Sequence, residues 1–83
     1  MKITVYSTST CPYCVMLKRW LDESGVNYTE HLVDRDPQAA QVMIEQSGQM
    51  AVPFSTIEHE DGKVDKILGF DRARFIAALE RAI

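Results

Sequence analysis

The chain has 83 residues, of which 46% are hydrophobic and 25% are charged, and its formal net charge is −3. This composition is typical of a folded globular domain and argues against a disordered chain. The negative net charge removes the attraction on which nucleic-acid binding depends, and no apolar run approaches the roughly 20 residues that cross a bilayer. We expect a single domain over residues 1–83 that acts as a monomer, with neither nucleic acid nor a membrane as partner.

The first half of the chain predicts a strand, a helix, a second strand and a second helix. Residues 2–6 read as a strand, and residues 12–24 combine a proline in the first turn with apolar side chains at helical spacing. Residues 27–33 are typical of a second strand. Asp36 precedes a proline, the usual pair at a helix start, so a second helix is predicted over residues 37–47.

The second half predicts a hairpin and a last helix. Strands at residues 54–58 and 64–68 flank Asp61-Gly62, a strong hairpin turn signal, and an aspartate N-cap opens a helix over residues 71–82. This order predicts an α/β fold, βαβαββα, with a four-stranded mixed sheet flanked by three helices and a parallel first β-α-β unit. The apolar stripes expected in the first and last helices are Met16, Leu17, Trp20 and Leu21, and Phe75, Ile76 and Leu79.

Two cysteines stand in the segment Cys11-Pro12-Tyr13-Cys14, where the first strand leads into the first helix. They close too short a loop to stabilise a fold, which indicates redox or metal chemistry. At a helix N-terminus the Cys11 thiolate is stabilised, so its pKa is expected to lie below the ordinary value of about 8.5. Cys14, one turn further in, can attack a mixed disulfide on Cys11. Lys18 is either a solvated surface residue or a positive charge near the pair.

We expect a cytoplasmic protein, because the first strand begins at residue 2 and leaves no room for a secretion signal. A zinc site needs four ligands. Only His31 and His59 remain as donors, and neither is beside the cysteines in sequence, so no metal is expected. Two inert core cysteines are the other alternative, which a Pro-Tyr pair at a helix start disfavours.

Three segments together resemble the glutaredoxin family and its relatives, the NrdH-type redoxins. They are Tyr6 to Cys14, ending in CPYC; Ala51-Val52-Pro53, at the family's Thr-Val-Pro position; and Gly69-Phe70-Asp71, at the family's Gly-Gly-x-Asp-Asp position. The resemblance implies a thioredoxin fold, a cis peptide before Pro53 and no bound metal or organic cofactor. It also implies dithiol exchange with Cys11 as the nucleophile and Cys14 as the resolving residue.

The resemblance further implies which residues bind the substrate or glutathione: Pro12, Tyr13, Ala51, Val52, Pro53, Gly69, Phe70 and Asp71. The backbone of Val52 is expected to pair with the substrate main chain, and Asp71 to contact an amine. Thr8, Ala51 and Arg72 depart from the family, which often has Lys or Arg, Thr and Asp at these places. Each lost charge-assisted contact costs about 1.5–3 kcal/mol, so glutathione is expected to bind less well than in the family.

The expected function is reduction of disulfide-containing proteins or glutathione mixed disulfides, with glutathione as the reductant. The alternative is an NrdH-type redoxin, which takes electrons from thioredoxin reductase and passes them to ribonucleotide reductase. Residues 33–40 and the single Gly-Phe before the last helix resemble that group. A module that dimerises around an iron–sulfur cluster, which Pro12 disfavours, and a redox sensor without turnover are further alternatives.

Overall fold

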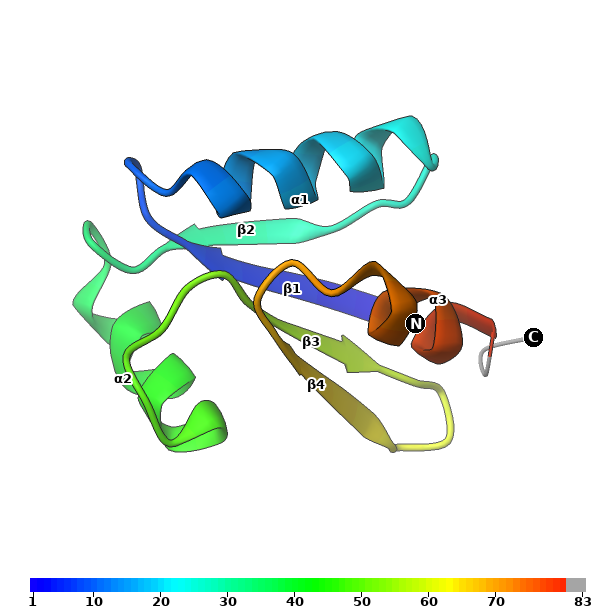
Figure 1. Ribbon diagram of the computed structural model, residues 1–83. Helices are drawn as coiled ribbons and strands as arrows, with labels where there is room; N and C mark the ends of the chain where they lie inside the picture. The colour runs from blue at the N-terminus through cyan, green and yellow to red at the C-terminus, as the bar shows by residue number, and fades with distance from the viewer. Residues whose placement is uncertain (81–83) are drawn as a thin grey trace.

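The computed structural model describes residues 1–80, which form a four-stranded sheet and three helices (Figure 1). The elements are β1 (Lys2–Ser7), α1 (Pro12–Glu23), β2 (Thr29–Leu32), α2 (Pro37–Ser47), β3 (Phe54–Glu58), β4 (Val64–Leu68) and α3 (Arg72–Glu80). This is the predicted order. The end of the predicted helix 71–82 lies outside the described residues. Across residues 1–80, no helix is long and apolar enough to cross a membrane.

The strands lie side by side in the order β2-β1-β3-β4. β1 pairs in parallel with β2 and antiparallel with β3, and β3 pairs antiparallel with β4. The predicted mixed sheet and its parallel first unit are therefore confirmed. The second strand is shorter than the predicted residues 27–33, because its pairing with β1 begins only at Thr29.

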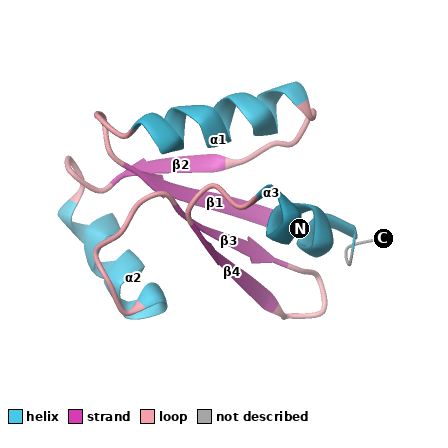
Figure 2. Ribbon diagram, in the orientation of Figure 1, coloured by secondary structure: helices cyan, strands magenta, loops and turns pink. Residues whose placement is uncertain are grey.

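Helices cover both faces of the sheet, α1 and α3 on one side and α2 on the other (Figure 2). Side chains alternate along β1, so that Ile3 and Val5 face α1 and α3 while Tyr6 faces α2. The larger core cluster consists of Ile3, Val5, Leu17, Leu21, Ile57, Ile67, Phe75 and Ala78. The smaller one consists of Tyr6, Val33, Ala39, Met43 and Phe54.

The predicted start and end of α2 are confirmed by its caps. The Asp36 carboxylate accepts the N–H groups of Gln38 and Ala39 at 3.1 and 3.2 Å, which satisfies two donors that have no partner within the helix. Gly48 ends the helix at φ +77°, a left-handed conformation that costs glycine little.

Two predicted core positions are wrong. Met16 and Ile76 are 48% and 45% exposed. Each is adjacent to a fully buried residue, Leu17 or Phe75, and neighbouring side chains point about 100° apart around a helix. α3 instead buries Ala78, three residues after Phe75, so its buried face is rotated from the predicted one.

Candidate active site

Four connecting segments meet at one edge of the sheet: those that follow β1, β2 and β4 and the one that precedes β3 (Figure 1). The strand register requires this arrangement. Tyr6, near the end of β1, lies opposite His31 of β2 and Phe54 of β3. Phe54 in turn lies opposite Leu68 of β4. The fold therefore brings to one edge the predicted site segments, residues 11–14, 51–53 and 69–71.

The two cysteines lie at the start of α1. Cys11 is the N-cap, with extended backbone at φ −97° and ψ 108°, and its Sγ accepts the N–H of Cys14 at 3.1 Å. The two residues form a disulfide, with their Cα atoms 5.2 Å apart. Cys14 is fully buried, whereas Cys11 is partly exposed and Pro12 and Tyr13 are exposed. The pair therefore has one residue that an external reactant can approach and one that is closed off from solvent.

The segment before β3 carries the expected cis peptide, between Val52 and Pro53. Pro53 is buried, while Ala51 and Val52 keep partly exposed surface. The carbonyl of Pro53 accepts the N–H of Gly69 at 2.7 Å. Gly69 has φ +81°, a conformation that side chains disfavour. This bond ties the segment before β3 to the segment after β4 and orders both beside the sheet edge.

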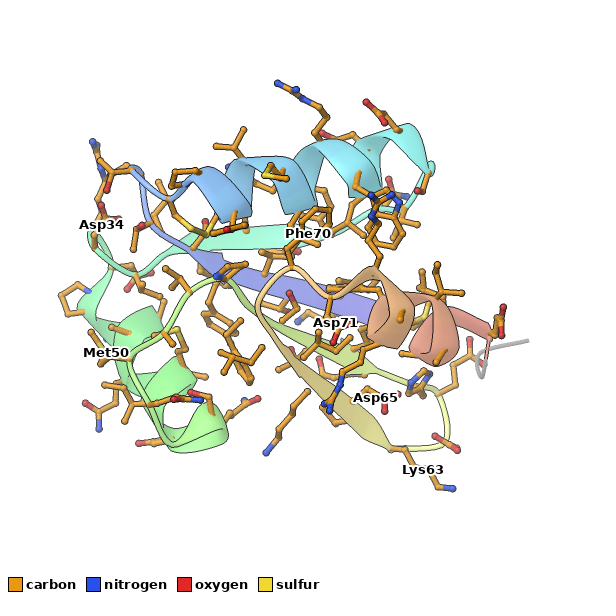
Figure 3. The ribbon with its side chains drawn as sticks, in the orientation of Figure 1. Asp34, Met50, Lys63, Asp65, Phe70 and Asp71 are labelled. Carbon is orange, nitrogen blue, oxygen red and sulfur yellow. A yellow bond between two sulfur atoms is a disulfide. The ribbon has the colours of Figure 1, made fainter. Side chains whose placement is uncertain are left out.

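Residues of the segment between β4 and α3 pack against α1 and cap α3. The ring of Phe70, labelled in Figure 3, packs on Trp20 with 6.2 Å between the ring centroids. The Arg72 guanidinium lies 5.7 Å from the Phe70 centroid. Asp71 caps α3 by accepting the N–H of Arg74 at 3.1 Å, as predicted. Trp20 is partly buried and packs against the core, where its ring and that of Phe75 form a T-shaped contact.

Residues of the segment before Cys11 are held by a residue that the sequence did not single out. The Asp34 carboxylate accepts hydrogen bonds from both the hydroxyl and the N–H of Ser9, the latter at 3.2 Å. The Ser9 hydroxyl lowers the pKa of Asp34. The two residues are 25 positions apart, and only the parallel register of β1 and β2 could have predicted their contact.

A second unpredicted contact joins α1 to the sheet. Glu30 of β2 binds the ammonium of Lys18 of α1 and accepts a hydrogen bond from the hydroxyl of Ser7 of β1, both at 2.6 Å. Burial raises the pKa of Glu30, but Lys18 and Ser7 outweigh burial, so the pKa lies below its ordinary value. Lys18 is therefore the ion-pair partner of Glu30 and not a free surface residue.

The histidines have partners of their own. His31 stacks on Tyr6, and His59 pairs with Asp65 at 2.6 Å in the β3–β4 hairpin. Within residues 1–80, no group of three or more His, Cys, Asp or Glu side chains is arranged to hold a metal ion. The prediction that the protein binds no metal or organic cofactor stays a prediction.

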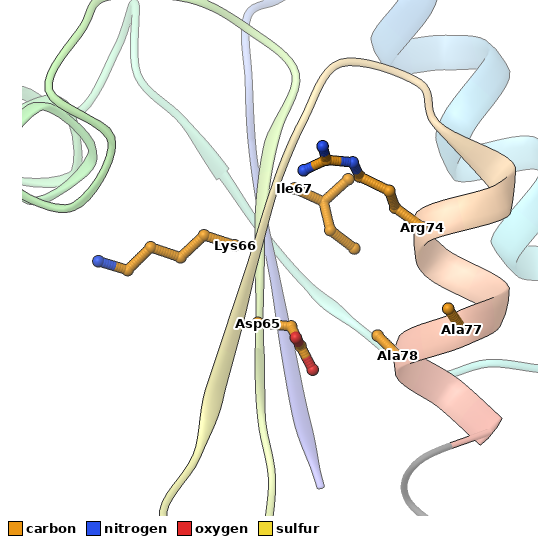
Figure 4. A pocket seen from close by; sticks show the side chains of 6 residues that line it. All are labelled: Asp65, Lys66, Ile67, Arg74, Ala77 and Ala78. Atoms are coloured by element: carbon orange, nitrogen blue, oxygen red, sulfur yellow. The ribbon is translucent and has the colours of Figure 1, made fainter.

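Two hollows in the surface are lined by other residues than those predicted for the site. One of about 240 Å³ lies between β4 and α3 (Figure 4), lined by Asp65, Lys66, Ile67, Arg74, Ala77 and Ala78. Another of about 440 Å³ lies on the α2 side of the sheet, lined by Lys2, Thr4, Tyr6, His31, Gln46, Thr56, Glu58, Val64 and Lys66. Neither includes a cysteine.

Comparison with known proteins agrees with this arrangement. The glutaredoxin family profile matches residues 3–58. The chain belongs to the glutaredoxin family. A probable glutaredoxin of Synechocystis is 33% identical to it over 72 residues, which is 84% of this chain but only 66% of that relative's length.

Solved structures show the same fold. A variant of a thioredoxin-like protein superposes with a TM-score of 0.79 at 31% identity and covers 94% of this chain and 99% of its own. The glutaredoxin-like protein NrdH-redoxin of Escherichia coli superposes with a TM-score of 0.71 at 30% identity, over 86% of both chains. The predicted thioredoxin fold is therefore confirmed. Glutaredoxins are thiol–disulfide oxidoreductases, and this member has two neighbouring cysteines at the expected place.

Proposed function

We propose that this glutaredoxin reduces protein disulfides or glutathione mixed disulfides through Cys11 and Cys14, as a monomer in a reducing, cytoplasmic compartment. The observation that carries the proposal is the position of Cys11 as the N-cap of α1, partly exposed, with the Cys14 N–H 3.1 Å from its sulfur. The same N–H and the helix dipole stabilise a thiolate on Cys11 in the reduced protein. Cys14 is fully buried, so a substrate reaches it only through Cys11.

The reaction proceeds by two thiol–disulfide exchanges. The Cys11 thiolate attacks one sulfur of the substrate disulfide, a Cys11–substrate bond forms, and the other substrate sulfur leaves as a thiolate that takes a proton. Cys14 then loses its proton and attacks the sulfur of Cys11. The substrate leaves as a second thiolate, and Cys11 and Cys14 are joined in the disulfide seen in the structure. Two electrons pass from the cysteine pair to the substrate.

The remaining residues of the predicted site bind the substrate in this proposal. Val52, a partly exposed residue before the cis Pro53, pairs through its backbone with the main chain of a peptide or of glutathione. Tyr13, which is 63% exposed, offers a ring beside the cysteines. The rest of the substrate site consists of Pro12, Ala51, Gly69, Phe70 and Asp71. Asp71 would bind an amine of the substrate while it still accepts the N–H of Arg74.

An NrdH-type redoxin is the second candidate. Thr8, Ala51 and Arg72 stand where glutaredoxins hold the charged groups of glutathione, which favours a reductant other than glutathione. The Escherichia coli NrdH-redoxin, described as having a thioredoxin-like activity profile, supports the same choice by its likeness. In this variant of the proposal, thioredoxin reductase reduces the disulfide and ribonucleotide reductase receives the electrons.

The test gives the oxidised protein a disulfide substrate and one electron donor at a time. The donor is either glutathione with glutathione reductase or thioredoxin reductase, and NADPH oxidation is followed. The wild type should turn over with at least one donor, and Cys11→Ser with neither. Cys14→Ser should retain turnover only on glutathione mixed disulfides, and only if glutathione binds. Reduction by thioredoxin reductase alone supports the NrdH candidate, and reduction by glutathione alone rejects it. A wild type that reduces no disulfide with either donor, or an active Cys11→Ser, would overturn the proposal.

A further inference from the structure

The short segment that carries the chain from β1 to Cys11 is held from outside. Residues 8–10 lie between the end of β1 and the N-cap of α1. Ser9 and Thr10 form a turn, and Ser9 donates both its hydroxyl and its N–H hydrogen bond to one carboxylate, that of Asp34. Asp34 lies at the edge of the sheet where α1 begins (Figure 3). The segment before Cys11 is therefore bonded to a residue of the connection between β2 and α2.

Asp34 is itself held by a well-bonded turn. The carbonyl of Leu32 accepts the N–H groups of Arg35 at 3.1 Å and Asp36 at 2.9 Å. The N–H of Val33 binds the carbonyl of Ser7 at 2.8 Å, which extends the pairing of β1 and β2 by one bond. Asp36 caps α2. The backbone on both sides of Asp34 is thus ordered independently of α1.

We propose that Asp34 is a positioning residue for Cys11: through Ser9 it holds the segment that places the sulfur at the helix N-terminus. This inference rests on the proposed function, because it concerns the sulfur that attacks the substrate. Without the Asp34 bonds, residues 8–10 gain freedom, and the Cys11 sulfur spends less time where the Cys14 N–H meets it. The thiolate is then less stabilised, and its attack on a disulfide is slower.

If Asp34 acted on Cys11 only through its charge, its removal would have the opposite effect on the pKa of Cys11. A carboxylate near a thiolate disfavours the charged sulfur, so removing only the charge should lower the pKa of Cys11 and speed its reactions. Arg35, the neighbour of Asp34, opposes that carboxylate charge. The sign of the change in an Asp34 variant therefore separates positioning from electrostatics.

The experiment compares reduced wild type with Asp34→Ala, Asp34→Asn and Ser9→Ala. The readouts are the pH profile of Cys11 alkylation and the turnover of a small disulfide. Asp34→Ala should raise the pKa of Cys11 and lower turnover about three- to tenfold, the factor that one net hydrogen bond is worth. Ser9→Ala should change both in the same direction by less, and Asp34→Asn, which keeps an acceptor, should stay near the wild type.

The matched control is Asp61→Ala, which removes an exposed carboxylate that accepts the N–H of Lys63 in the β3–β4 turn, at the other end of the strands. It should leave both readouts unchanged. A Cys11 pKa that falls or stays constant in Asp34→Ala, or equal effects of the Ala and Asn variants, would overturn the proposal. If Asp34→Ala does not fold, Ser9→Ala carries the test. A wild type without turnover contradicts the proposed function, while the alkylation profile still tests the role of Asp34.

Discussion

The contact between α1 and the sheet predicts a stability change that depends on pH in a defined direction. Glu30 accepts a hydrogen bond from the hydroxyl of Ser7 and binds the ammonium of Lys18, both at 2.6 Å. The substitution Glu30→Gln keeps the shape of the side chain but removes its charge. Lys18 then keeps its position with no carboxylate to bind.

The magnitude follows from the exposure of the pair. The Gln oxygen can still accept a hydrogen bond, but the bonds from Ser7 and Lys18 both lose their charged acceptor, at about 1–1.5 kcal/mol each. The side chains of Lys18 and Glu30 are, however, 26% and 28% exposed. Solvent screens such a pair in part, so the expected loss at pH 7 is about 1–2 kcal/mol. Each kcal/mol should lower the melting temperature by about 4–8 °C in a domain of this size.

The pH dependence has a fixed sign. Because the pKa of Glu30 is lowered in the folded protein, its stabilisation is fully present above the unfolded value of about 4.3. That stabilisation is lost as the pH falls through the lower folded value. The difference in unfolding free energy between wild type and Glu30→Gln should therefore be largest near pH 7 and shrink below about pH 4.

The assay is urea unfolding at pH 7 and pH 3, followed by the fluorescence of Trp20, which contacts both Phe70 and Phe75. A double-mutant cycle with Lys18→Met isolates the pair and should give a coupling energy of about 1 kcal/mol at pH 7. A Glu30→Gln protein as stable as the wild type at pH 7, or a difference that grows on acidification, would refute this reasoning.

The core and the site segments give two further predictions. Phe75→Ala should cost about 3–5 kcal/mol because the side chain is fully buried, whereas Ile76→Ala should cost less than about 0.5 kcal/mol. Equal costs in urea unfolding would contradict the buried face assigned to α3. Gly69→Ala should cost about 1–2 kcal/mol because its φ is +81°, although an added Cβ would meet no atom within 4 Å. An unchanged melting temperature would show that this conformation is not required.

Local signals in the sequence were sufficient for the order of elements and for the place of the cysteines. A proline directly after Cys11 predicted a helix start there, and Asp36 predicted the start of α2. Both predictions depend on residues within one turn of the feature, and the structure confirms both caps.

Features that depend on distant residues were not predicted. The helical spacing of apolar residues did not determine which of two adjacent apolar residues faces the core, so Met16 and Ile76 were misplaced. The contacts of Asp34 and Glu30 depend on how β2 is registered against β1, which no local pattern specifies. The cis peptide before Pro53 was expected only from the family resemblance, because most X–Pro bonds are trans.

The most direct test of the proposed chemistry is the alkylation rate of each cysteine in the reduced protein between pH 4 and pH 10, with peptide mapping by mass spectrometry. We expect Cys11 to react first, with a pKa below the ordinary thiol value of about 8.5, and the buried Cys14 to react far more slowly. Equal rates for the two cysteines, or a Cys11 that titrates as an ordinary thiol, would contradict the proposed chemistry.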